Sequence, residues 1–223
     1  QGLLGRKELA GSATHGAPES PLRPEGRTLA LVGLAIVLAL AALPVVAGGY
    51  LLSVASEILI FALFAASLQF IMGVGGMISF GHAAYLGLGA YAVALSVTHW
   101  DAPMTGALAL APVAGAVGAL VFGWFCVRLS GVYLAMLTLA FAQIAWSVAF
   151  QWVEVTGGDN GLLGIWPAAW ASDPAAFYWL TLGLVALAVL ALRRVVFAPF
   201  GYGLRAARDS TLRAEAVGIH ARR

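Results

Sequence analysis

Two long stretches of this chain contain no lysine or arginine, and this feature constrains the fold more than any other. They are residues 28–127 and 129–192, separated only by Arg128. The chain of 223 residues is 61% hydrophobic and 10% charged, whereas a soluble domain carries about 25% charged residues. Stretches of this length without cations predict a protein that lies in a membrane, and they exclude an ordinary water-soluble domain.

Six segments are long and apolar enough to cross a bilayer as helices, which takes about 20 residues at 1.5 Å each. Helices are expected because lipid offers no hydrogen-bond partners to an open strand. The predicted fold class is therefore all-α, a polytopic helical membrane protein with about six transmembrane helices. The expected spans are residues 28–47, 52–72, 80–98, 104–127, 132–152 and 177–192.

The positions of the cations predict the orientation of these spans. With a cytoplasmic N-terminus, the inside segments hold all 12 Lys and Arg residues and the outside segments hold none, as the positive-inside rule requires. We expect a flexible cytoplasmic tail at 1–27, a transmembrane domain at 28–192 and a cytoplasmic segment at 193–223. The inside segments are 1–27, 73–79, 128–131 and 193–223, and the outside segments are 48–51, 99–103 and 153–176.

A glycine-rich break separates the second and third predicted spans, in the sequence GVGGMISFGHAAYLGLGAY at 73–91. Two interpretations stay open for 73–82. One is a packed turn followed by a helix, and the other is a broken or re-entrant element whose freed amides and carbonyls line a polar pathway. Small residues at one face of the third span predict a close helix interface there. They are Ala83, Gly87, Ala90 and Ala94.

The outer loop at 153–176 contains the sequence TGGDNGLLGIWP. Its glycines and the Asp-Asn pair predict tight turns. A loop of this length is more than a connector, so we expect it to cover the mouth of a pathway or to meet an external partner. The residues of interest are Gly157, Gly158, Asp159, Asn160 and Gly161.

Several polar side chains fall inside the predicted spans. Glu57 lies about five residues, or roughly 7–8 Å, below the outer end of the second span, so it serves either at the interface or in a pathway. The others are expected mainly as hydrogen-bond partners between helices, worth about 1 kcal/mol each. They are Gln69, Ser79, His82, Thr138 and Gln143.

The chain offers no catalytic constellation. Ser79 and His82 lie three residues apart, but the surrounding ISFGH is neither a nucleophile elbow nor a zinc motif, and Asp159 alone is a poor calcium site. No phosphate-binding GxxxxGK[ST] loop occurs, and no basic patch interleaved with aromatics suggests nucleic acid. We therefore expect no enzyme, no metal site and no nucleic-acid partner, which leaves a channel or a transporter subunit.

The segment after Arg193 and Arg194 is polar enough to leave the bilayer. Asp209 or Ser210 is expected to cap a short helix that runs to about Val217, with Gly218 following as the C′ residue. Such a helix either lies on anionic lipid or enters a groove of a soluble partner.

Three segments of the chain, taken in order, resemble one family. They are GGMISFGHAAYLGLGAY at 75–91, TGGDNGLLGI at 156–165 and FGYGLRAARDSTLRAEAVGI at 200–219. Together they resemble the permease of branched-chain amino acid ABC importers, of the LivM type. The resemblance runs from about residue 50 to the end of the chain, and it implies further spans, so we expect the domain to continue beyond residue 223.

The resemblance implies a multi-pass subunit of the bacterial plasma (inner) membrane that works with partners. These are a second permease subunit in a heterodimer, two cytoplasmic ATP-binding subunits that hydrolyse ATP, and an external or periplasmic substrate-binding protein. The implied function is translocation of leucine, isoleucine and valine, and this chain is expected to bind no cofactor itself.

The resemblance also implies that the cytoplasmic segment is a coupling helix that docks into an ATPase subunit. Ser210-Thr211 departs from the Asn-Glu-like pair of many members, at a surface position. The residues that match the family pattern are Arg205, Arg208, Asp209, Ala214, Glu215, Ala216, Gly218 and Ile219.

A branched aliphatic zwitterion needs an apolar pocket with amides or hydroxyls near its carboxylate. The start of the third span, from Ser79 to Ala83, is expected to offer unpaired N–H groups and a positive dipole end. Two alternatives remain: a permease for urea, short amides or a sugar in the same superfamily, and a self-contained channel or ion-coupled carrier. The candidate pathway residues are Glu57, Ser79, Gly81, His82, Ala83, Tyr85 and Gln143.

Overall fold

The computed structural model describes residues 26–126, 129 and 131–219, without the side chains of Leu212 and Arg213. This part of the chain is entirely helix and loop, which confirms the all-α fold class. Most of the predicted N-terminal tail lies outside the described residues, as do Arg128 and the final residues from 220.

Six long helices follow the six predicted spans, and their ends lie within four residues of the expected bounds. Five of them are long and apolar enough to cross a membrane. The exception, α3, has 19 residues but is less apolar, because it begins at His82 and carries His99 in its last turn. The six are α1 (Arg27–Val46), α2 (Gly49–Gln69), α3 (His82–Trp100), α4 (Met104–Cys126), α5 (Val132–Gln151) and α7 (Pro174–Val196).

Shorter elements lie at the two ends of these helices. A π-helical turn, η1 (Phe70–Val74), extends α2 at one end, where α8 (Pro199–Asp209) and α9 (Thr211–Ala216) also lie. The opposite end carries α6 (Val153–Thr156) and two single 3-10 turns, η2 (Gly158–Asn160) and η3 (Ala169–Ala171).

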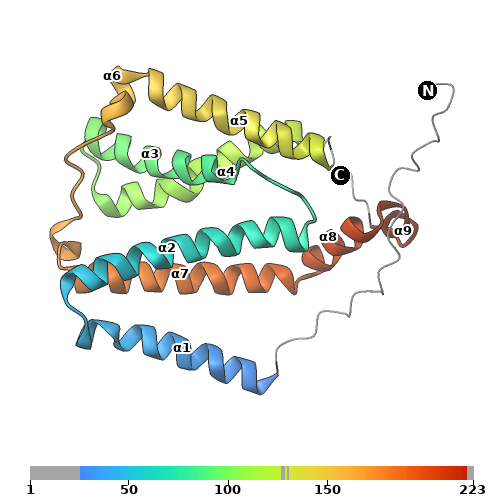
Figure 1. Ribbon diagram of the computed structural model, residues 1–223, viewed down its shortest axis with the longest axis horizontal. Coiled ribbons are helices and arrows are strands. Elements are labelled where there is room, and N and C mark those ends of the chain that lie inside the picture. Colours follow the sequence, from blue (N-terminus) through green and yellow to red (C-terminus); the bar gives the residue numbers. More distant parts are fainter. Residues whose placement is uncertain (1–25, 127–128, 130, 220–223) are drawn as a thin grey trace.

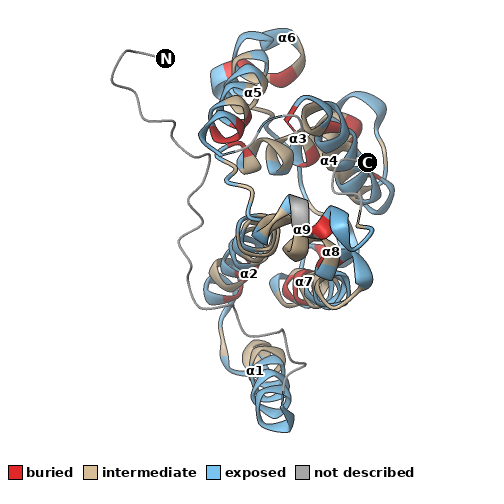
Figure 2. Cartoon of the chain, turned by 90° about the vertical axis from the view of Figure 1, so that its right-hand side faces the viewer, coloured by how far each residue is buried: buried red, intermediate tan, exposed pale blue. Residues whose placement is uncertain are grey.

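The long helices run side by side in two groups (Figure 1). In one group α2 packs along α7, with α1 on the outside against α7, and in the other α3 packs along α4 and also contacts α5. Figure 2 shows the two groups end-on, with α1 at the edge. Arg27, Arg193 and Arg194 belong to the end that carries α8 and α9, as the predicted span count requires.

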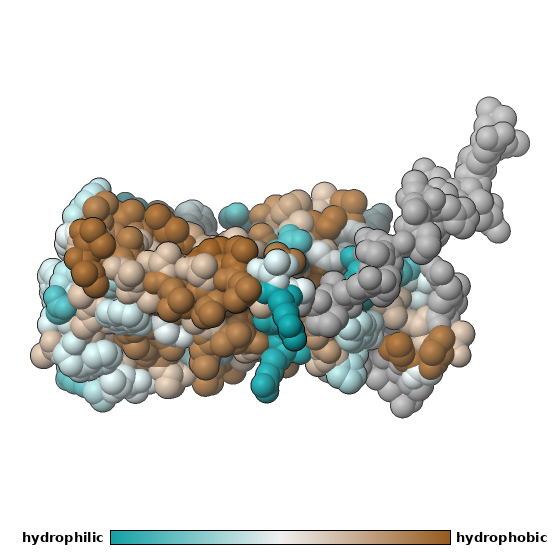
Figure 3. All heavy atoms as spheres, turned by 90° about the horizontal axis from the view of Figure 1, so that it is seen from below, coloured by the Kyte–Doolittle hydropathy of each residue, from teal (hydrophilic) through white to brown (hydrophobic). Residues whose placement is uncertain are grey.

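The surface of the helices is largely apolar, and Figure 3 shows broad hydrophobic areas on the face seen from below. Leu120 of α4, for example, is 74% exposed. Such exposure would be costly in water but is not in lipid, whose chains are as apolar as leucine. The surface therefore fits a membrane environment.

A small core joins α1, α2 and α7. It contains Leu52, Leu59, Tyr178 and Leu182, and the Tyr178 side chain is 0% exposed. The tyrosine hydroxyl donates a hydrogen bond of 2.8 Å to the carbonyl of Leu40 in α1. Pro44 lies four residues after Leu40 within α1, and because proline has no N–H, that carbonyl lacks its usual helical donor. Tyr178 therefore supplies the bond that Pro44 removes.

Close packing of α3 on α4 depends on glycines, but not on the predicted small-residue face. A Cβ at Gly89 would lie 3.2 Å from the carbonyl oxygen of Ala111 in α4, and a Cβ at Gly118 would overlap Leu88. Ala83 and Ala90 are exposed, and nothing lies within 4 Å of a Cβ at Gly87. Within this chain the predicted small-residue face is therefore not the surface that packs on α4, and its small side chains leave space beside α3.

The glycine-rich break is longer than a simple tight turn between α2 and α3. After η1, residues 75–81 form no helix and lead back between the helices to the start of α3 (Figure 1). The amide of Phe80 donates to the hydroxyl of Thr138 in α5 at 3.1 Å. A Cβ at Gly81 would collide with the carbonyl of Thr138, so glycine is required for this approach to α5.

Candidate functional site

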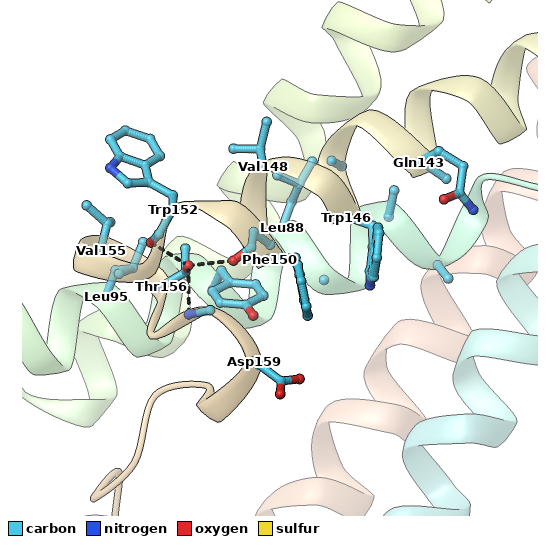
Figure 4. A pocket seen from close by; sticks show the side chains of 18 of the residues that line it. Leu88, Leu95, Gln143, Trp146, Val148, Phe150, Trp152, Val155, Thr156 and Asp159 are labelled. Atoms are coloured by element: carbon cyan, nitrogen blue, oxygen red, sulfur yellow. Dashed lines mark hydrogen bonds between the residues drawn. The ribbon is translucent and has the colours of Figure 1, made fainter.

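A cavity of about 760 Å³ lies between α3 and α5 and reaches α6 and η2. Figure 4 shows its wall from close by, with Trp146 and Gln143 on α5 and Leu88 and Leu95 on α3. The volume lies in the range of small-molecule sites, which are usually apolar with few polar groups. This cavity has that character, because its apolar walls carry only a few polar side chains. Those side chains belong to Tyr91, Gln143, Thr156 and Asp159, beside the indoles of Trp146 and Trp152.

Regular helix positions build both walls. Gln143, Trp146 and Phe150 are spaced i, i+3 and i+7 on α5, which places them on one helical face. The rings of Trp146 and Phe150 stack with centroids 5.1 Å apart. Facing them, the absent side chain of Gly87 and the small Ala83 and Ala84 leave the α3 wall recessed. The space thus follows from large residues on one helix and small residues on the other.

Residues 153–161, in the loop predicted to face outside, form a compact cap at one end of the cavity. The hydroxyl of Thr156 donates to the carbonyls of Ala149, at 2.5 Å, and Trp152, at 2.8 Å, and it accepts from the amide of Gly158 at 3.4 Å. Gly157 and Gly158 have positive φ values of 74° and 58°, which favour glycine. The sequence prediction of tight turns here is confirmed.

The cap places Asp159 at the α6 end of the cavity, where its side chain is exposed (Figure 4). Five of the residues singled out from the sequence line this cavity: Ala83, Gly87, Gln143, Gly158 and Asp159. They come from the third span, the fifth span and the outer loop, so the structure brings together three features that are distant in the sequence. Gly157, Asn160 and Gly161 belong to the same cap but not to the lining.

His82 faces away from the cavity, towards α2. Its Nε2 lies 2.7 Å from the hydroxyl of Ser67, and its ring centroid is 5.1 Å from that of Phe64. Tyr85 meets the His82 ring edge-on at 6.0 Å. His82 therefore joins the two helix groups, while its buried Nδ1 has no hydrogen-bond partner. This geometry fits the predicted interhelical bond.

The other pathway candidates also lie outside the cavity lining. Glu57 is exposed on α2, Ser79 is half-buried in the 75–81 segment, and Gly81 packs on Thr138. One of the amides expected to be unpaired between Ser79 and Ala83 has a partner, because the Phe80 amide donates to the hydroxyl of Thr138.

Several lining residues were not predicted from the sequence. Phe80, Tyr91, Trp146 and Thr156 line the cavity but were not singled out. The signal for Trp146 was its spacing of three residues from Gln143, which puts both on one face of α5. No comparable signal marks Thr156, because its role depends on the loop folding back onto α5.

At the opposite end, the predicted short helix is preceded by another. Pro199 at the first position starts α8, a favourable place for proline, and Ser210 separates α8 from α9. The amide of Ile219 donates to the carbonyl of Ala214 at 2.9 Å. The amide of Gly218 donates to the carbonyl of Glu215 at 3.0 Å. With φ of 87° at Gly218, this is a Schellman motif, which confirms Gly218 as the C′ residue.

The residues of the expected coupling pattern divide into two sets. Ala214 is buried, Ile219 is half-buried near Gly203 of α8, and Glu215 and Ala216 are exposed on α9. Arg205 and Arg208 line a second cavity of about 500 Å³, together with Gln69 and Gly73 at the end of α2 and Arg193 of α7. Arg208 forms an ion pair with Asp209 at 2.9 Å.

Among the described residues, no group of three or more His, Cys, Asp or Glu side chains is placed to hold a metal ion.

Comparison with known proteins identifies a family and two relatives. Residues 50–223 match the family described as "Branched-chain amino acid transport system / permease component". Two relatives are named high-affinity branched-chain amino acid transport system permease protein LivM, from Escherichia coli (strain K12) and Salmonella typhimurium (strain LT2). Each is 25% identical, over 76% and 74% of this chain respectively.

The chain spans about half the length of these relatives, since the matches cover 46% and 45% of them. No solved structure matches this chain significantly. The family match covers α2 through α9 with both cavities, and the chain therefore belongs to the branched-chain amino acid transport permease family.

Proposed function

We propose that this chain is a membrane-spanning subunit of an ATP-binding-cassette importer and that the cavity between α3 and α5 is part of its path for branched-chain amino acids. The observation that carries the proposal is the lining of this cavity: apolar walls with a few polar groups. Leucine, isoleucine and valine combine an aliphatic side chain with a zwitterion, so they need both kinds of surface. The family of the chain and the names of its relatives support this class of substrate.

The shape of the cavity favours a passage over a single close-fitting site. Its lining on α3 runs from Ala83 to Leu95, a distance of about 18 Å at 1.5 Å per residue. This length exceeds that of one amino acid. The carboxylate of Asp159 would attract the substrate ammonium at the outer end, whereas Gln143 offers an amide deeper in the passage.

We assign the energy source to partner subunits, as the permease family of the chain suggests. We assign α8 and α9 to contact with one of two cytoplasmic ATP-binding subunits. A second permease subunit would complete the membrane domain, and an external substrate-binding protein would deliver the amino acid to the outer loop. The assembly would reside in the bacterial plasma membrane.

A substitution that fills the passage tests the proposal. Gly87 of α3 lines the cavity, and Gly183 of α7 does not; neither has an atom within 4 Å of an added Cβ. In proteoliposomes with the complete complex, we expect Gly87→Leu to lower the uptake of labelled leucine at least tenfold. Gly183→Leu, the matched control, should leave uptake near the wild-type value.

The outcomes separate the alternatives. If Gly87→Leu and Gly183→Leu took up leucine equally well, the cavity would not be part of the transport path. If the wild-type complex transported urea or a sugar and not leucine, the substrate would have to be reassigned. Transport of substrate without ATP or partner subunits would indicate a self-contained carrier.

A further inference from the structure

Arg208 of α8 contacts the end of a helix that lies far away in the sequence. One terminal nitrogen of its guanidinium donates to the carbonyl of Gly73 at 2.5 Å, while Nε donates to Asp209 at 3.0 Å. The arginine side chain is 22% exposed. Gly73 lies in η1, the π-helical turn at the end of α2, where carbonyls lack helical donors and a cation is favourable.

Gly76 makes room for this contact from the other side. Its φ of 65° lies in the left-handed region, and a Cβ at this position would overlap the Cγ of Arg208. The backbone of the glycine-rich break therefore lies directly against the aliphatic part of the arginine. Two separate features, the bond to Gly73 and the approach of Gly76, fix α8 to this part of the chain.

A short series of backbone contacts continues from Gly73 to the cavity. The amide of Met77 binds the carbonyl of Ile71 in η1 at 3.2 Å. At the other end of this segment, the amide of Phe80 binds Thr138 of α5 at 3.1 Å, and Phe80 itself lines the cavity. Residues 75–81 thus connect the contact of Arg208 with the wall of the passage. Single π-helical turns such as η1 often mark functional sites.

We infer that Arg208 is a positioning residue that fastens α8 and α9 to the end of α2, so that movement of this helix pair reaches the cavity through residues 75–81. The inference rests on the proposed function, in which partner subunits move α9. It assigns Arg208 to a contact within this chain, distinct from the exposed α9 surface at Glu215 that would meet the partner.

Hydrogen–deuterium exchange of the purified chain in detergent tests the contact without any transport. Loss of a charge-assisted hydrogen bond in Arg208→Met should speed exchange of amides in 74–80 about tenfold. Glu215→Gln, the control on the exposed α9 surface, should leave their exchange unchanged. Gly76→Asn is the second variant: asparagine tolerates positive φ, but its Cβ would displace the arginine, so the same acceleration is expected. Unchanged exchange in either well-folded variant would overturn the contact.

The complete complex in proteoliposomes tests the coupling. We expect Arg208→Met to lower the number of leucine molecules transported per ATP hydrolysed at least threefold, because α8 then moves without pulling η1. Faster exchange with an unchanged transport ratio would overturn the inference. If the wild-type complex shows no ATP-dependent uptake, the proposed function fails, whereas the exchange result still decides whether Arg208 holds the break.

Discussion

The hydrogen bond between Tyr178 and the carbonyl of Leu40 predicts a specific coupling with Pro44. In Tyr178→Phe the carbonyl loses its donor at a site where the tyrosine ring is 0% exposed. Leaving a buried acceptor without a partner costs roughly 1–3 kcal/mol, and hydrogen bonds between membrane helices reach about 1.7 kcal/mol. We therefore expect Tyr178→Phe to lower the free energy of unfolding by about 1.5 kcal/mol.

The same substitution should cost much less in a Pro44→Ala background. There the new backbone N–H at position 44 can bond the Leu40 carbonyl within α1, so Tyr178→Phe should cost below about 0.5 kcal/mol. The coupling energy of the double-mutant cycle is then about 1 kcal/mol. Equilibrium unfolding in mixed detergent micelles, followed by circular dichroism, measures each variant. Tyr50→Phe is the control, because Tyr50 is 81% exposed.

Equal costs of Tyr178→Phe in the two backgrounds would refute this reasoning. The tyrosine hydroxyl would then stabilise α7 independently of the backbone hydrogen bond that α1 lacks at Pro44.

Two further substitutions test the cap and the junction between helix groups. Gly158→Ala should lower the thermal unfolding midpoint more than Gly164→Ala. Both glycines have positive φ, but only a Cβ at Gly158 would lie 3.0 Å from the carbonyl oxygen of Phe150. Equal shifts would show that backbone strain alone determines the loss of stability. Ser67→Ala should remove the bond to His82 and lower the free energy of unfolding by about 1 kcal/mol, measured by detergent unfolding. No change in that variant would mean that the ring contacts of His82 suffice to hold α3 against α2.

The sequence predicted the long helices well, because uninterrupted apolar stretches leave a chain in lipid little choice but to form them. It also predicted the left-handed Gly218 from local helix-ending rules. It did not predict α8, because glycines in FGYGLRAARD lower helix propensity, and the favourable start at Pro199 was not recognised.

The direction in which a residue faces was harder to predict than its helix. His82 and Ala83 are neighbours, yet one contacts α2 and the other lines the cavity. Which helix packs against each face depends on the path of residues 75–81, and that path depends on contacts of Gly81 with Thr138 and of Gly76 with Arg208. Such contacts join residues far apart in the chain, and no local pattern encodes them.

The position of α1 at the edge of the bundle has a consequence for how sequences of this kind can diverge. The family match begins at residue 50, just inside α2, and α1 has no buried residue of its own. Lipid accepts almost any apolar side chain on its exposed faces, so substitutions there meet little selection. The positions of α1 that face Tyr178 should be conserved. A comparison of close orthologues would show these positions as conserved and the rest of the helix as variable.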